Sequence, residues 1–446
     1  MTQPADRTVR PFFHAPRAIL TVLALLQAAY QVCFLARGFD FIVARLPIDD
    51  AYYYLQVAWN TPRLGFVTFD GIHRTNGLQF LWCWTLILLA GVISSKAALL
   101  VACLGACLLF NALCYLPIHH LGESLGRPVF TTLLGLGWFN VNLLSYHWYL
   151  SGMENSLHSL IVWSLFAAMV GVIQSPDSRY SRAWIRFSIL LVLNVWCRID
   201  AALLSALACG FALWHGRNRL SRRLVCGILL IAASGAILLT AGYYAMGRSW
   251  IPVSAVIKGR ASTWTLDLFP LLAARGFEMA TPVSFLGSPW LLRLSEETRT
   301  LWMPLVLGIF VTVCAWAFLR ASRLSGDPLW PLWSAAGWAS LGQLLLLSGM
   351  GTIAIYGVWY QSAFIIFCVL CVAIVGDGAV NWVRRRSPRS VGMLRSAAIL
   401  ASLSYLAFTG AWFLRLFADQ SYRDSSFYAK YRLCRWLREK DRKSVV

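Results

Sequence analysis

Residues 18–36 read AILTVLALLQAAYQVCFLA, nineteen positions without a charged side chain. A helix needs about 20 mostly apolar residues to cross the hydrocarbon core of a bilayer, so this stretch predicts a membrane helix. Similar apolar stretches recur along all 446 residues. We therefore predict an all-α, polytopic membrane protein with about 11 to 13 membrane helices.

The overall composition excludes a soluble enzyme. Hydrophobic residues make up 59% of the chain and charged residues 13%, whereas an ordinary soluble domain has roughly 25% charged residues. The net charge of +20 comes from Lys and Arg that concentrate in short segments between apolar stretches. Because the positive-inside rule places such segments in the cytoplasm, the charge indicates membrane orientation, and we expect no nucleic-acid partner.

Basic segments also predict the topology. With the N-terminus in the cytoplasm, the first crossing delivers a polar, aromatic loop, residues 37–78, to the outer face. Residues 79–95 are apolar but short, so they either cross or lie in the interface. If they do not cross, every dense basic loop before the tail is cytoplasmic, and the first external loop extends over 37–96. The remaining helical segments are then expected near 97–116, 129–149, 156–173, 187–215 (a pair bent at 196–200), 224–246, 301–319, 329–348, 362–380 and 394–414.

On this layout residues 1–415 form one membrane domain with a long external loop at 247–300. Residues 416–446 form a short basic tail, for which we expect an amphipathic helix on anionic headgroups. Most of the 12 cysteines lie in apolar segments and are interpreted as small buried hydrophobes.

Two adjacent acids, Asp49 and Asp50, open the sequence DDAYYYLQVA in the first external loop. Adjacent helical residues do not share a face, so the two carboxylates are expected to differ in role. One would serve as a general base and the other would cap the helix that follows. The alternative is a pair that only opens the Tyr-rich helix.

Further candidates follow along the chain. His73 and Arg74 in FDGIHRTNG (69–77) suit a phosphate or sugar hydroxyls, with an ordinary surface turn at Asn76–Gly77 as the alternative. Glu154 lies between two crossings as a supporting acid, a metal ligand or a sugar-hydroxyl acceptor, or simply as a helix-terminal acid.

Arg198 and Asp200 lie between the apolar halves of 187–215. Ionisable groups at membrane depth usually face a cavity, which makes the pair a site candidate; a structural salt bridge is the alternative. Lys258 offers one ammonium for a phosphate. Tyr360 begins a crossing, where an interfacial aromatic is the default.

Together these motifs resemble the GT-C superfamily of multi-spanning glycosyltransferases, in the bacterial branch with an Asp-Asp-Ala-Tyr-Tyr-Tyr signature. The matching segments, in the family's order, are Asp49 to Tyr54, Thr68 to Gly71, Thr75 to Gly77, Ser151 to Glu154, Arg198 to Asp200, and Pro252 to Ser254 with Lys258.

The resemblance implies a polyprenyl-phosphate-linked sugar as donor and an envelope glycan or lipid as acceptor. It implies inverting transfer on the periplasmic face of the bacterial inner membrane. Asp49 matches the family's base, and Asp50 supports it or is the base itself. Arg198, Lys258 and then Arg74 are the candidates to hold the phosphate, while Glu154 and Asp200 orient sugar hydroxyls or these cations. Some members use a divalent cation and others do not, so the metal stays open.

Two other functions compete with this interpretation. A transporter or flippase of lipid-linked sugars would also need buried cations, but it would place polar residues at mid-membrane on paired broken helices. Here most polar candidates fall in external loops right after crossings, and no internal repeat is visible. A non-catalytic scaffold would not need two acids beside a membrane crossing.

Overall fold

The computed structural model describes residues 16–47, 49–144, 149–174, 177–254, 328–349 and 362–386. Within these ranges the regular elements are helices, and one isolated antiparallel bridge joins Thr68 to Arg74. The helices are α1 (Pro16–Ala36), α2 (Phe39–Arg45), α3 (Asp49–Leu64), α4 (Phe80–Val92), α5 (Lys96–Leu113), α6 (Tyr115–Leu125), α7 (Pro128–Leu144), α9 (Asn155–Gln174), α10 (Asp177–Cys197), η1 (Ile199–Ala201), α11 (Ala202–Gly216), η2 (Arg217–Arg219), α12 (Arg222–Gly247), α16 (Leu329–Gly349) and α17 (Ser362–Arg386). The all-α prediction is confirmed.

Six stretches of the described residues are long and apolar enough to cross a membrane: Pro16–Ala36, Lys96–Leu125, Asn155–Gln174, Ile199–Gly216, Arg222–Gly247 and Ile365–Val383. On α12, apolar side chains such as Leu230 and Ile237 are exposed, which suits a helix that faces lipid. The chain is thus a multi-pass membrane protein. The crossings predicted at 301–319 and 394–414, and the tail 416–446, lie outside the described residues.

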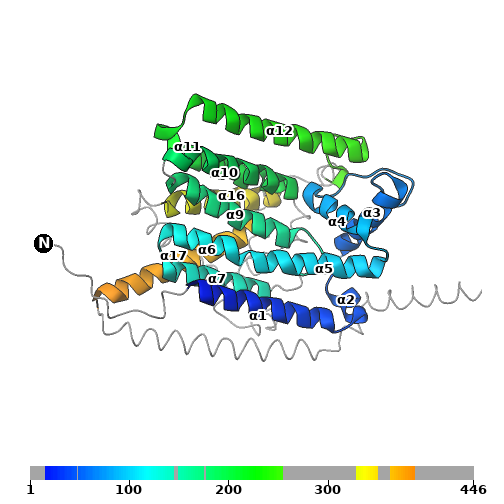
Figure 1. Ribbon diagram of the computed structural model, residues 1–446, viewed down its shortest axis with the longest axis horizontal. Helices are drawn as coiled ribbons and strands as arrows, with labels where there is room; N and C mark the ends of the chain where they lie inside the picture. Colours follow the sequence, from blue (N-terminus) through cyan, green and yellow to red (C-terminus); the bar gives the residue numbers. More distant parts are fainter. Residues whose placement is uncertain are drawn as a thin grey trace, which may run out of the picture.

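The long helices lie side by side in a bundle, and the short helices α2, α3 and α4 gather at one end of it (Figure 1). The junction of α6 and α7, the start of α12 and the end of α17 lie at the opposite end (Figure 1). That opposite end carries the basic residues of these junctions, among them Arg127, Arg222 and Arg385. Such clustering at one end is the pattern that the positive-inside rule predicts.

Helix α4 contains 13 residues, which makes it about 20 Å long, whereas the hydrocarbon core is roughly 30 Å thick. It packs against α3 and α5 at the end of the bundle where α3 lies. Its length favours the layout in which residues 79–95 do not cross the membrane.

The bend expected at 196–200 is present. Helix α10 ends at Cys197, Arg198 is extended with φ −151°, and the single turn η1 leads into α11. The sequence prediction of 187 for the start of this pair was ten residues late, because α10 begins at Asp177. The first part of α10 is amphipathic: Trp184 and Phe187 are buried while Arg186 is exposed. A search for uninterrupted apolar stretches misses such a segment, because polar residues alternate with the buried ones.

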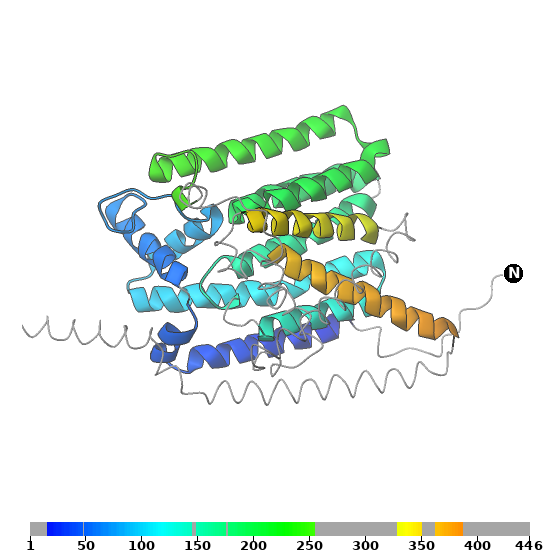
Figure 2. The same ribbon diagram turned by 180° about the vertical axis from the view of Figure 1, so that it is seen from behind.

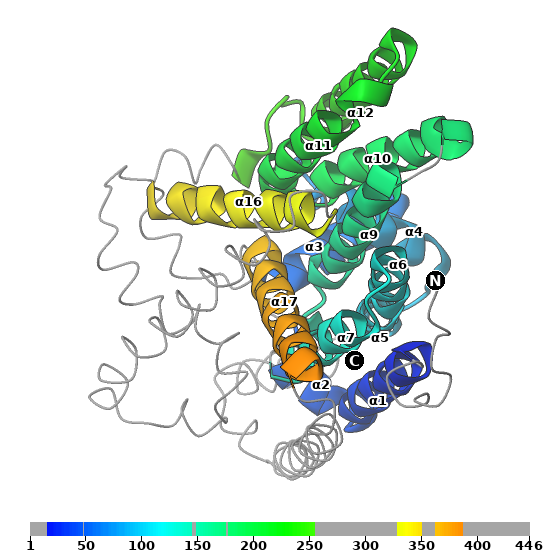
Figure 3. The same cartoon turned by 90° about the vertical axis from the view of Figure 1, so that its left-hand side faces the viewer.

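Helices α16 and α17 complete the bundle on the face seen from behind (Figure 2). Helix α16 packs against α11, and α17 packs against α7 and α16. Figure 3 shows α16 reaching across the bundle beside α9 and α11. This layer brings α16 beside the α10–α11 bend, although about 140 residues separate the two segments.

Candidate active site

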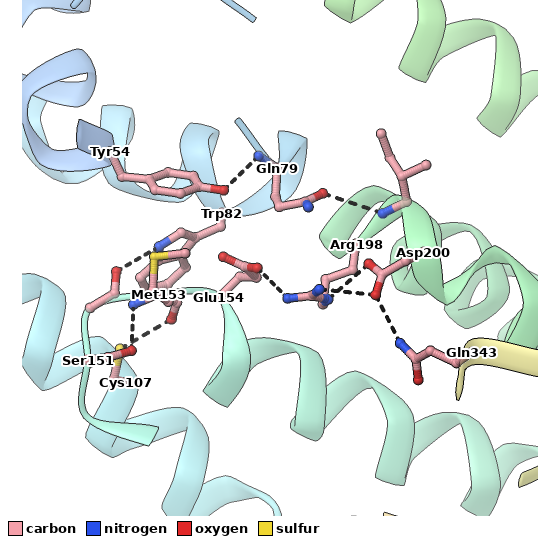
Figure 4. Close-up of polar contacts among 12 residues, drawn as sticks. Tyr54, Gln79, Trp82, Cys107, Ser151, Met153, Glu154, Arg198, Asp200 and Gln343 are labelled. Carbon is pink, nitrogen blue, oxygen red and sulfur yellow. Dashed lines mark hydrogen bonds and ion pairs between the residues drawn. The ribbon is translucent and has the colours of Figure 1, made fainter. Parts of the chain in front are cut away.

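The central feature of the site is a buried ion triad. Arg198 donates from Nη1 to Glu154 Oε1 at 2.6 Å, and from Nε and Nη2 to the two carboxylate oxygens of Asp200 at 3.1 and 3.0 Å (Figure 4). Arg198 and Glu154 are each 1% exposed. Three N–H groups of one guanidinium are therefore shared between two carboxylates. Arg198 and Asp200 are thus in direct contact, an arrangement that fits both the predicted site and the alternative of a structural salt bridge.

Local backbone structure explains why Arg198 points inward. Because the helix stops at Cys197, the extended Arg198 turns its side chain toward α9, where Glu154 immediately precedes the helix. Asn194, one turn back in α10, donates to Ser205 Oγ of α11 at 3.0 Å and so joins the two halves of the bend. Gln343 of α16 donates from Nε2 to Asp200 Oδ2 at 3.0 Å.

The loop before α9 places Glu154 beside α3. Gly152 adopts a left-handed conformation with φ +81°, and its carbonyl accepts a hydrogen bond from Trp82 Nε1 at 3.0 Å. A Cβ at Gly152 would lie 3.2 Å from the Cβ of Ala51, so the loop and α3 are in close contact. The hydroxyl of Tyr54, one turn along α3 from Ala51, accepts a hydrogen bond from the backbone N–H of Gln79 at 2.8 Å.

Both acids of the first loop lie in the opening turn of α3. Carboxylates are favoured there by the positive end of the helix dipole. Asp50 is exposed, and its charge acts on Glu154 to raise the pKa of that carboxyl. The structure therefore brings Asp50 within electrostatic reach of the triad, and Asp49 occupies the neighbouring backbone position.

Burial raises the pKa of Glu154 above its ordinary value, although the nearby Arg198 charge opposes the shift. Its second oxygen, Oε2, is buried and has no hydrogen-bond partner among the described residues. Such an orphaned acceptor is unusual in a protein interior. The hydrogen-bonding capacity of this oxygen is therefore unused within the described residues.

Both the nitrogen and the oxygen of the Asn76 side-chain amide form hydrogen bonds within the protein. Its Nδ2 donates to the carbonyls of Tyr243 and Ser249 at 3.1 and 2.9 Å, and its Oδ1 accepts from the Val253 N–H at 3.0 Å. Asn76 itself is fully buried and is not part of a surface turn. A Cβ at Gly247 would lie 2.6 Å from Asn76 Cγ. The residue joins the first loop to the segment that follows α12.

His73 and Arg74 lie in an exposed turn of the same loop. His73 Nδ1 lies 2.6 Å from Asp70 Oδ2, and the His73 side chain is 80% exposed. Arg74 donates to the Ala245 carbonyl at 3.4 Å, and its guanidinium lies 5.2 Å from the Phe66 ring. Their described contacts are with this loop and with α12, not with the triad.

Two predicted residues, Lys258 and Tyr360, lie outside the described residues. Sequence reasoning missed Gln79, whose Oε1 accepts from the Ile199 N–H at 3.4 Å, and Gln343. A lone amide in the apolar run 329–348 was the available signal for Gln343, because polar groups in membrane helices seek partners. Within the described ranges no three His, Cys, Asp or Glu side chains gather closely enough to hold a metal ion.

An apolar groove of about 350 Å³ lies beside the bend, between α10, α11 and α12. Its lining includes Trp196 and Ser205, which flank the Arg198–Asp200 turn, and Leu239 on α12. The groove therefore runs along α10, α11 and α12 near the bend, and its lining does not include the three residues of the triad.

Comparisons with solved structures identify the fold. An oligosaccharyltransferase from Archaeoglobus fulgidus in its apo form matches with a TM-score of 0.51 and 13% identity, over 92% of this chain and 56% of that chain. Archaeal AglB from Archaeoglobus fulgidus, in complex with an inhibitory peptide and a dolichol-phosphate, matches with a TM-score of 0.50 and 13% identity, over 94% and 59%. ArnT from Cupriavidus metallidurans bound to undecaprenyl phosphate matches with a TM-score of 0.49 and 16% identity, over 88% and 64%.

This chain thus spans only 56 to 64% of the length of these structures. No family model and no curated protein matches the sequence. At this level of identity the likeness concerns the fold alone. The chain has the GT-C fold of multi-spanning membrane proteins.

Proposed function

We propose that the protein is a membrane glycosyltransferase. It moves a monosaccharide from a polyprenyl-phosphate donor to a hydroxyl of a cell-envelope glycan or lipid, on the periplasmic face of a bacterial inner membrane. The observation that carries this proposal is the buried Glu154–Arg198–Asp200 triad beside the acidic first turn of α3. The GT-C fold supports it.

The reaction is a single displacement at the anomeric carbon. An acceptor hydroxyl oxygen forms a bond to that carbon while the bond to the phosphate oxygen breaks, which inverts the configuration. The hydroxyl proton passes to a carboxylate at the start of α3. Asp49 is the proposed base and Asp50 its support, or the base itself.

The leaving phosphate monoester carries the bond's electron pair, so negative charge grows on its oxygens. A cation held in a dry, fixed position stabilises such charge far better than one in water. Arg198 is held in this way by two carboxylates at 1% exposure. Lys258 is proposed as a second cation, and Arg74 as a third.

Two further features support a lipid-linked sugar as donor. The unpartnered Glu154 Oε2 can accept a hydrogen bond from a sugar hydroxyl. The apolar groove between α10, α11 and α12 can hold part of a prenyl chain whose phosphate lies at the bend. The fold neighbour AglB was solved with a dolichol-phosphate.

The test uses purified protein in nanodiscs, radiolabelled polyprenyl-phosphate sugars and an extract of envelope acceptors. The parent should transfer label, and Asp49→Asn with Asp50→Asn should lose transfer by about a hundredfold or more, as expected for removal of a general base. Glu123→Gln is the matched control, because this exposed acid lies in the last turn of α6, and the junction of α6 and α7 is at the opposite end of the bundle (Figure 1). A parent that transfers no sugar would overturn the proposal, and active Asp variants would overturn the base assignment.

Transport of lipid-linked sugars is the alternative. The break between α10 and α11 beside a buried cation favours it, because broken helices form the substrate sites of many transporters. Proteoliposomes that flip a fluorescent polyprenyl-phosphate sugar without any glycosyl transfer would establish transport instead.

A further inference from the structure

A second cavity lies on the other side of α3 from the triad. It has a volume of about 700 Å³ and is formed where α2, α3 and the start of α5 meet. This volume falls in the range typical of small-molecule sites, which is roughly 300 to 1,000 Å³. None of the residues given a role in the proposed reaction lines it.

The walls of this cavity, the α3–α5 pocket, are mostly apolar. Phe39 of α2, Tyr52 and Tyr53 of α3, and Leu99 and Leu100 of α5 line it. Helix α5 begins a predicted membrane span, so the pocket lies where that span starts. A cavity in this position can receive a molecule whose chain extends along the membrane helices.

One ammonium group, that of Lys96, lines the same pocket. Its Nζ donates to Gln56 Oε1 at 2.8 Å, and it has no carboxylate partner among the described residues. Gln56 is itself oriented by a hydrogen bond to Asn60 Oδ1 at 3.0 Å. The pocket therefore combines apolar walls with one positive charge that a neutral amide positions, which is complementary to an anionic amphiphile.

Helix α3 separates the pocket from the triad. Ala51 and Tyr54 contact Gly152 and Gln79 on the triad side, whereas Tyr52, Tyr53 and Gln56 line the pocket. In helical register Asp49 is one turn before Tyr52 and Tyr53, and Asp50 is one turn before Tyr54. The first turn of α3 thus lies between the pocket and the triad, where an acceptor bound in the pocket could meet a donor held at the triad.

We propose that the α3–α5 pocket is the acceptor subsite and that the acceptor is a lipid with an anionic headgroup. Its phosphate or carboxylate lies against Lys96, and its alkyl chain packs along Leu99 and Leu100. The acceptor role of this lipid rests on the proposed transfer reaction. The binding of an anionic lipid to the pocket can be measured without that reaction.

Binding is tested with the full chain and a fluorescent short-chain phosphatidic acid, with the matching diacylglycerol as the neutral probe. The parent should bind the phosphatidic acid more tightly by about tenfold, the effect of one charge-assisted hydrogen bond. Lys96→Gln should remove this preference and Lys96→Arg should keep it. Inorganic phosphate should not displace the probe, since the chain supplies much of the affinity.

A steric pair of variants locates the binding. Ala97→Trp places an indole in the pocket, whose lining includes Ala97, and should abolish binding of both probes. Val92→Trp is the matched control, because Val92 is 84% exposed at the end of α4 and should leave binding unchanged. Unfolding midpoints close to that of the parent exclude misfolding. Parent-like binding by Lys96→Gln and Ala97→Trp, or displacement by inorganic phosphate, would overturn the lipid site.

Transfer kinetics separate this inference from the proposed function. Once an anionic lipid acceptor supports transfer, Lys96→Gln should raise its KM by about tenfold and leave the donor KM and kcat unchanged. An unchanged acceptor KM overturns the acceptor subsite alone. A parent that binds the lipid but never transfers sugar overturns the proposed function, and with it the acceptor role, but leaves the anionic-lipid site standing.

Discussion

Two carboxyl groups among the described residues, Glu154 in the buried triad and Asp70 in the exposed turn of the first loop, have pKa values that shift in opposite directions. In the buried triad, desolvation raises the pKa of Glu154 even though Arg198 lies 2.6 Å away. In the exposed turn, hydrogen bonds from His73 and from the backbone hold the pKa of Asp70 below its ordinary range. Burial, not the presence of a partner, decides the direction.

The contrast also distinguishes what each cluster can do. An exposed ion pair contributes little to stability because water and salt screen it. A buried one depends on every partner, since a charge left alone in a dry site is strongly unfavourable. Of the two clusters, the buried triad is therefore the one that holds a cation in a fixed position. Four substitutions test this distinction.

The largest effect is expected from Arg198→Gln. It leaves Glu154 and Asp200 without their counter-charge, so the free energy of unfolding should fall by about 3 to 5 kcal/mol. Chemical unfolding in detergent micelles measures it. Arg198→Lys is the control: it keeps the charge but cannot reproduce the two-pronged contact with Asp200, so an intermediate loss is expected. A parent-like stability of Arg198→Gln would mean that the triad is not buried in the membrane-embedded protein.

A smaller loss is expected from Gln343→Leu. This change removes the N–H donor to Asp200 Oδ2 from α16, a hydrogen bond to a charged group worth about 1.5 to 3 kcal/mol. Ser340→Ala on the same helix is the matched control, since its hydroxyl bonds only to the Ala336 carbonyl one turn back. Equal stabilities of the two variants would show that α16 does not support the triad.

The sequence predicted one part of this triad and missed another for a physical reason. Arg198 and Asp200 are two residues apart at a helix break, so their proximity could be read locally. Glu154 lies 44 residues before Arg198, and Gln343 lies 143 residues after Asp200. Those contacts depend on how α9 and α16 pack against the bend, which no local pattern contains. The family resemblance supplied the order of the motifs but not their contacts.

The first loop shows the same limit. The opening of a helix at Asp49 and Asp50 was predictable from their capping preference. The role of Asn76 was not, because its partners Tyr243, Ser249 and Val253 are more than 160 residues away. Among the helices, long apolar runs were predicted well, whereas the amphipathic start of α10 was missed.

Glu154→Gln should change how stability depends on pH. Because the pKa of Glu154 is raised in the folded state, its contribution is fully present below the ordinary Glu pKa and is lost as the pH rises through the raised value. The unfolding midpoint of the parent minus that of Glu154→Gln should therefore decrease as the pH increases from about 4 toward neutrality. A constant difference across this range would contradict the raised pKa.

Asp70→Asn should give the opposite and smallest response. A lowered pKa means that the contribution of Asp70 is present above the ordinary Asp pKa and is lost as the pH falls through the lowered value. The difference in unfolding midpoint between the parent and Asp70→Asn should thus become smaller below about pH 4. Because the Asp70 side chain is 43% exposed, salt at about 1 M should reduce this difference, while that for Arg198→Gln persists. A salt-resistant difference at Asp70 would mean that the turn is shielded from water, and the contrast between the two clusters would fail.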